Sequence, residues 1–175
     1  MKHVFYDNIA DDVERDYYKL LGLEDGKRNY KYIEKSYLTP RYQLNNNIDK
    51  YKVFVPESNG NGDYGEVLST PVIASPDESC TPTFISIGQF DSEIEAKNLL
   101  QYVKTKFLRS LLGIKKTTQH NAPNNWSYIP LQDFTLNSDI DWTKSIAEID
   151  QQLYKKYGLS EEEIQFIESK VKEME

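Results

Sequence analysis

Apolar residues recur at helical spacing through the second half of the chain. They step by three and four residues, which places them on one face of a helix: Ala96, Leu99, Leu100, Val103, Phe107 and Leu111. Ser92 and Glu95 form a capping-box sequence at the start of this pattern, and Gly113 is the expected terminator. We therefore predict one long helix over residues 92–113.

Helical patterns also occur near both ends of the chain. Residues 141–156 predict a helix that Asp141 caps and that ends at Gly158. Ser160 with Glu163 repeats the capping-box sequence for a last helix. Near the N-terminus, residues 7–23 have acids in the expected first turns and apolar residues on one side. The pattern predicts a helix there as well.

Short runs of β-branched and aromatic residues predict strands. These runs cover residues 51–56, 69–75, 82–90 and 126–134. Residues 27–38 are ambiguous, but their tyrosines favour a strand. Together with the helices, they predict an α+β fold, in which a small, mostly antiparallel sheet packs with one long helix and a C-terminal helical hairpin follows. We expect an α+β domain over residues 1–140 and a helical extension over residues 141–175.

Composition narrows the class of protein. The chain has 175 residues, enough to bury a substantial core, and a single cysteine, Cys80. A lone cysteine excludes an internal disulfide and a zinc site built from several cysteines, and it is typical of a reducing compartment. The N-terminus has no apolar signal region, and no apolar run has the roughly 20 residues of a membrane span. A soluble, cytoplasmic protein with no membrane partner is expected.

Charge is distributed in blocks. The net charge is −7, yet residues 96–132 hold six basic residues and no acidic one. The preceding residues 59–95 hold seven acids and no base, and residues 133–175 hold eleven acids against five bases. A long acid-free stretch in an acidic protein indicates a surface that meets a polyanion, although a solvated helix face is the alternative.

The order of side chains in the acid-free stretch fits a DNA duplex. Lys and Arg neutralise phosphates, while Thr, Gln and Asn can contact phosphates or base edges. The candidate DNA-binding residues are Lys104, Lys106, Arg109, Lys115, Lys116, Thr117, Gln119, Asn121 and Asn124.

A second hypothesis is a Mg²⁺-dependent nuclease. Pro76 and Asp77, followed by Glu95 and Lys97, match a PD…ExK pattern, in which carboxylates bind the metal and the lysine stabilises the reacting groups. Such a tripeptide needs a strand, where alternate side chains share one side. Here it falls at the predicted start of a helix, where Glu95 has a capping role. No other catalytic or metal-binding motif is present in the sequence, so no catalytic or metal site is predicted.

Several blocks of the sequence resemble a known family in the same order. They are YKVFVPESNGNGDYGEVLSTPVIASPDESC, TFISIGQFDSEIEAKNLLQYVKTKFLRSLLGIKKTTQ, WSYIPLQDFT and SDIDWTKSIAEIDQQLYKKYGLSEEEI, and LGLEDGKRNYKYI precedes them. These blocks span roughly residues 19–173. They are similar to the C-terminal target-recognition region of bacterial fused type II restriction–modification enzymes, in which a restriction endonuclease is joined to an adenine-N6 DNA methyltransferase.

The resemblance implies DNA sequence recognition without catalysis in this chain. The family's Asn-Pro-Pro-Tyr tetrapeptide, its S-adenosylmethionine loop and its nuclease motif lie upstream of the matching region, and the first two are missing here. The implied partners are double-stranded DNA and the upstream methyltransferase and nuclease domains, which would use S-adenosylmethionine and Mg²⁺. The chain itself would hold no cofactor. The remaining alternative is a scaffold segment that binds protein domains and not DNA.

Overall fold

The computed structural model describes residues 5–9, 16–37, 47–58, 64–66, 68, 70–115 and 123–174, with only the backbone given for Lys115, Pro123 and Asn124. The strands are β1 (Tyr17–Glu24), β2 (Lys27–Glu34), β3 (Tyr51–Pro56), β4 (Val72–Ala74), β5 (Glu78–Cys80) and β6 (Phe84–Phe90). The helices are α2 (Glu93–Lys104), α3 (Lys106–Lys115), α4 (Pro123–Trp126), α5 (Ile146–Tyr157) and α6 (Glu161–Lys170), and a short 3₁₀ turn, η1 (Lys35–Tyr37), follows β2.

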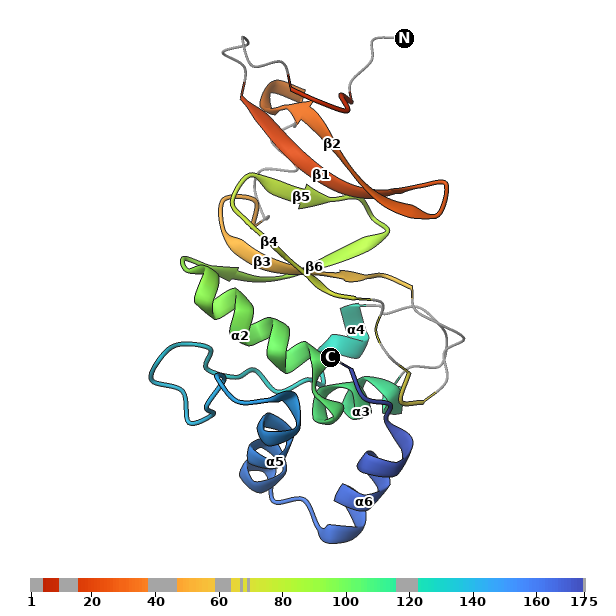
Figure 1. Ribbon diagram of the computed structural model, residues 1–175, viewed down its shortest axis with the longest axis vertical. Coiled ribbons are helices and arrows are strands. Elements are labelled where there is room, and N and C mark those ends of the chain that lie inside the picture. Colours follow the sequence, from red (N-terminus) through yellow and green to blue (C-terminus); the bar gives the residue numbers. More distant parts are fainter. Residues whose placement is uncertain are drawn as a thin grey trace.

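The fold is α+β, as predicted, and its strands form two sheets of three strands each. The strand order is β2-β1-β5 in the first sheet and β4-β3-β6 in the second. All pairings are antiparallel except that of β1 with β5, which is parallel. Figure 1 shows the first sheet at one end of an elongated molecule, the second sheet in the middle and the helices at the other end.

A tight turn builds the hairpin of β1 and β2. Asp25 and Gly26 both have positive φ angles, 50° and 74°, which is the backbone of a two-residue type I′ turn. This local geometry fixes the register, in which Glu24 lies opposite Lys27. The strand favoured over residues 27–38 is confirmed for residues 27–34 as β2, whereas residues 35–37 form η1. Tyr32 of β2 forms a bridge with Tyr6.

The strand β3 is buried on both sides and separates two apolar clusters. Val53 and Val55 pack into the larger cluster with the helices, whereas Phe54, between them, faces the first sheet. Successive side chains of a strand point to opposite faces, so one strand serves both clusters. Leu21 of β1 is 1 % exposed in the smaller cluster, which joins the two sheets.

The C-terminal helical hairpin is confirmed. Ser160 and Glu163 form a complete capping box at the start of α6, and Gly158 ends α5 with a φ of 65°. The cap of α5 is Ser145 rather than the predicted Asp141. Both helices bury side chains in the cluster that α2 and α3 share, and the domain boundary at residue 140 stays a prediction.

Two predicted elements are wrong. Residues 17–24 form the strand β1 and not the end of a helix, because pairing with β2 and burial of Leu21 override the helical pattern. Residues 126–134 form no strand: Trp126 ends α4, and the rest of this run has no regular element. Within the described part of the chain, no helix is both long and apolar enough to cross a membrane.

Candidate nucleic-acid interface

The predicted long helix is interrupted at Thr105, in the middle of the candidate interface. Thr105 is extended, with φ −60° and ψ 148°, so α2 ends at Lys104 and α3 begins at Lys106. Its hydroxyl donates to the carbonyl of Tyr102 at 2.7 Å and accepts the N–H of Leu108 at 3.2 Å. Thr105 therefore closes one helix and caps the next.

A buried carboxylate completes the cap of α3. Asp150 of α5 accepts the backbone N–H groups of Lys106 at 3.0 Å and of Phe107 at 2.8 Å. The first N–H groups of a helix have no partner within the helix, and a negative charge there also interacts favourably with the helix dipole. Burial raises the pKa of the Asp150 carboxyl to about 6, although these two hydrogen bonds and Arg109 act in the opposite direction.

Arg109 does not lie on the surface, which corrects its assignment as a phosphate contact. The residue is 3 % exposed, and its guanidinium donates to four backbone carbonyls. The shortest bond reaches Lys172 at 2.5 Å, and weaker ones of 3.2–3.4 Å reach Lys104, Thr105 and Glu66. Burial lowers the pKa of the guanidinium, and Asp150 opposes that shift. Arg109 therefore ties α3 to α2, to residue 66 and to the C-terminal segment.

The two lysines near the helix break differ in their contacts. The ammonium of Lys106 lies 2.5 Å from a carboxylate oxygen of Glu168 on α6, and its side chain is only 12 % exposed. A phosphate would have to compete with this ion pair. Lys104 is half-buried, and no ion pair joins it to another of the described residues. Of the three cations around the break, Lys104 alone keeps the freedom that a phosphate contact requires.

The other six candidate residues fall on one connection, between the end of α3 and the start of α4. Lys115 ends α3 and Asn124 lies in α4, and only the backbone of each is described. Lys116, Thr117, Gln119 and Asn121 lie outside the described residues. These six positions lie within ten consecutive residues of the sequence, whereas Lys106 and Arg109 have internal partners.

The residues of the nuclease hypothesis make other contacts. Asp77 follows β4 with a φ of 63° and lies 3.0 Å from the ammonium of Lys35. Glu95 is in the first turn of α2, where its N–H donates to Ser92, and Lys97 pairs with Glu93 at 3.0 Å. Among the residues whose placement is described, no cluster of three or more His, Cys, Asp or Glu side chains could hold a metal ion.

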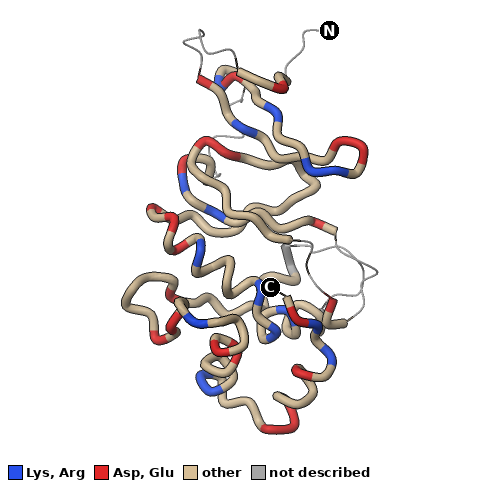
Figure 2. Tube along the Cα trace, viewed as in Figure 1, with Lys and Arg blue, Asp and Glu red and all other residues tan. Residues whose placement is uncertain are grey.

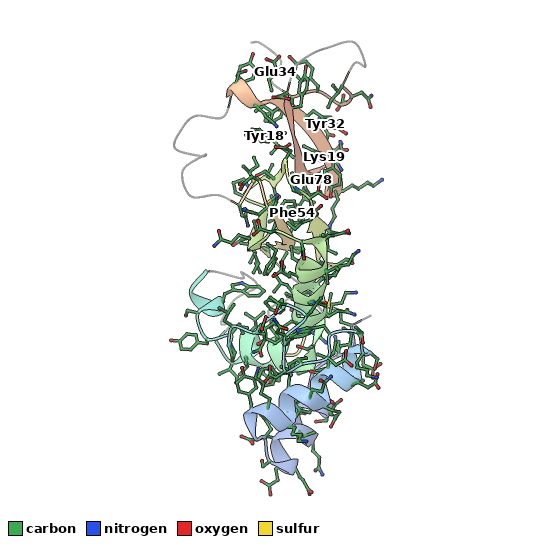
Figure 3. All side chains as sticks on the ribbon, turned by 90° about the vertical axis from the view of Figure 1, so that its left-hand side faces the viewer. Tyr18, Lys19, Tyr32, Glu34, Phe54 and Glu78 are labelled. Carbon is green, nitrogen blue, oxygen red and sulfur yellow. The ribbon has the colours of Figure 1, made fainter. Side chains whose placement is uncertain are left out.

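The first sheet carries several lysines and tyrosines that lie outside the acid-free stretch. Lys19 of β1 lies 2.8 Å from Glu78 of β5 and 4.2 Å from the centre of the Tyr30 ring, and Figure 3 shows Lys19 beside Glu78. Lys31 pairs in the same way with Glu24 at 2.6 Å. Lys19 and Lys31 therefore have carboxylate partners within the sheet.

Lys52 is a second buried cation that the sequence did not reveal. It lies in β3, where its ammonium donates to the carbonyls of Ile48, Lys50 and Ser75 at 3.2, 2.8 and 2.7 Å. Burial lowers its pKa to about 8. Its position between apolar residues of a strand gave no sign that it would be enclosed.

Comparisons of the chain with protein-family models, with curated proteins and with solved structures found no match.

Proposed function

We propose that this chain binds double-stranded DNA as the target-recognition region of a restriction–modification enzyme. Upstream methyltransferase and nuclease domains carry out the chemistry, with S-adenosylmethionine and Mg²⁺ as their cofactors. The observation that supports the proposal best is the connection from Lys115 to Asn124. It contains two lysines, two threonines and several amide side chains, and no acid. Such a segment can neutralise phosphates and reach base edges without repelling the duplex.

The fold reduces the number of phosphate contacts in the proposal. Lys106 and Arg109 are used internally, which leaves Lys104, Lys115 and Lys116 as the cations for DNA. The logarithm of DNA affinity falls with the logarithm of salt concentration by about 0.9 for each phosphate neutralised, so three contacts give a slope of about −2.7. Between about 50 and 200 mM salt the affinity then falls about 40-fold, whereas five contacts would give about 500-fold. A net charge of −7 agrees with weak binding by the isolated chain.

A salt titration with a duplex of mixed sequence tests the proposal. Fluorescence anisotropy would compare the wild-type chain with the double variant Lys115→Gln/Lys116→Gln. We expect the double variant to reduce the slope by about 1.8, because it removes two phosphate contacts. The matched control is Lys144→Gln/Lys155→Gln, which removes two exposed lysines from the acidic C-terminal part and leaves the slope unchanged.

Two results would contradict DNA binding. One is the absence of measurable affinity for the duplex at low salt. The other is an equal loss of affinity in the control and in the Lys115/Lys116 variant, because net charge alone would then explain the binding. In either case, the scaffold hypothesis becomes the better description of the chain.

A further inference from the structure

An apolar groove lies between α3 and α6. One face of α3 forms one wall with Phe107, Ser110, Leu111 and Ile114, at helical spacing. The facing side of α6 supplies the other wall, and the groove has a volume of about 670 Å³. Leu159, Glu162, Glu163, Phe166 and Ile167 line this second side.

The groove has a buried floor and exposed apolar walls. Phe107 and Ile167 belong to the core, whereas Ile114 is 67 % exposed and Phe166 is 51 % exposed. Tyr64 closes part of the groove, with its ring centre 5.6 Å from that of Phe166. Both of these apolar wall residues are therefore more than half exposed. Adjacent apolar side chains left open on two neighbouring helices are typical of a binding groove.

The acidic residues at the groove indicate which class of partner it would bind. The run Glu161–Glu163 opens α6, and Glu162 and Glu163 line the groove itself. Figure 2 shows acidic residues at the turn where α6 begins. This acidic rim attracts cationic groups. A helix of ten residues is about 15 Å long, so the walls extend over nearly three turns.

We propose that the groove between α3 and α6 binds an amphipathic protein helix that carries lysines or arginines beside its apolar stripe. The apolar side chains of the partner, at spacings i, i+3, i+4 and i+7, enter between Ile114 and Phe166. Its cations meet Glu162 at the rim. The Glu163 carboxylate is engaged with Ser160 in the capping box, so Glu162 is the freer of the two groove carboxylates. This inference does not depend on DNA binding.

Three synthetic peptides of about 15 residues, or about four helical turns, provide the probe. The first has leucines at the stated spacing and lysines elsewhere, the second has glutamates in place of the lysines, and the third is a scramble of the first. Isothermal titration should show that the first peptide binds with a Kd below about 100 µM and that the other two bind at least about tenfold more weakly.

Variants of the chain test whether the peptide binds in the groove. Phe166→Asp and Ile114→Asp should each weaken binding of the leucine–lysine peptide at least about tenfold, because each puts a charge on an apolar wall. Ile94→Asp is the matched control, since Ile94 is an equally exposed apolar residue of α2, and it should change nothing. Glu162→Lys should weaken binding of the lysine peptide and strengthen binding of the glutamate peptide. All four positions are exposed, so circular dichroism should report an unchanged fold.

Three results would overturn the inference. Equal binding of the scrambled peptide means attraction to net charge alone. Undiminished binding to Phe166→Asp and Ile114→Asp places the peptide elsewhere. Self-association of the wild-type chain in sedimentation, lost in Phe166→Asp, means that a second copy occupies the groove. Loss of DNA binding in the lysine variants described above would leave the peptide result untouched.

Discussion

Arg109→Met separates a structural role of this cation from a role in DNA binding. Methionine keeps an unbranched stem and removes every donor of the guanidinium. The variant loses the 2.5 Å bond to the carbonyl of Lys172 and the weaker bonds to Lys104, Thr105 and Glu66. It also removes the positive charge that acts to lower the pKa of the buried Asp150.

The size of the effect follows from these contacts. A hydrogen bond to a charged group contributes about 1.5–3 kcal/mol to stability, and the three longer bonds contribute less because of their length. Removing the guanidinium also removes the cost of burying it, which offsets part of the loss. We therefore expect Arg109→Met to lower the free energy of unfolding by about 3 kcal/mol. For a chain of this size the melting temperature then falls by about 6–12 °C.

The assay measures stability and DNA binding on the same samples. Urea denaturation gives the free energy of unfolding, and the salt titration gives the number of phosphate contacts. Arg109→Met should lose stability without a change in the salt slope. Lys104→Met, five residues earlier at the end of α2, should show the reverse: nearly unchanged stability and a slope reduced by about 0.9. If Arg109→Met is as stable as the wild type and has the smaller slope, the guanidinium contacts phosphate and the reasoning fails.

Two further variants test the packing around the site. Burial raises the pKa of Asp150 from 3.8 to about 6, so its contribution to stability is complete below about pH 4 and is lost as the pH rises through about 6. The difference in unfolding free energy between wild type and Asp150→Asn should therefore shrink by up to about 3 kcal/mol over that range in urea titrations, and parallel pH curves would exclude this role. Gly88 has a φ of 88°, and an added Cβ would lie 2.4 Å from a ring carbon of Phe90. In denaturation assays, Gly88→Ala should lose more stability than Gly26→Ala, which has a φ of 74° and open space around it. Equal losses would mean that the Phe90 ring moves aside without cost.

Elements with local signals could be predicted from the sequence. The capping box of Ser160 and Glu163 and the left-handed Gly158 depend only on residues within one turn, and both are present in the structure. The strand Tyr51–Pro56 agrees with its prediction because its β-branched and aromatic residues suit a strand buried on both faces. These signals were sufficient for the fold class and the C-terminal hairpin.

Elements that depend on distant partners could not be predicted. The helical pattern of residues 17–23 agrees equally well with a strand once Leu21 packs against Phe54 of the other sheet. The apolar spacing of residues 96–111 continues through Thr105 without interruption, so nothing local marks the end of α2. Part of the cap that begins α3 comes from Asp150, which is 43 residues further along the chain than Phe107.

The acid-free stretch has two parts with different explanations. Around the break between α2 and α3, the missing acids are supplied by later segments: Asp150 caps α3 beside Arg109, and Glu168 pairs with Lys106. A run of cations without acidic neighbours in sequence is therefore weak evidence for a polyanion partner, because tertiary contacts can provide the counter-charge. That explanation does not extend to Lys104, for which the described residues provide no ion pair. The proposal that the chain binds DNA thus depends on Lys104 and on the connection from Lys115 to Asn124. The variant Lys115→Gln/Lys116→Gln therefore tests it more directly than any substitution in the first turn of α3.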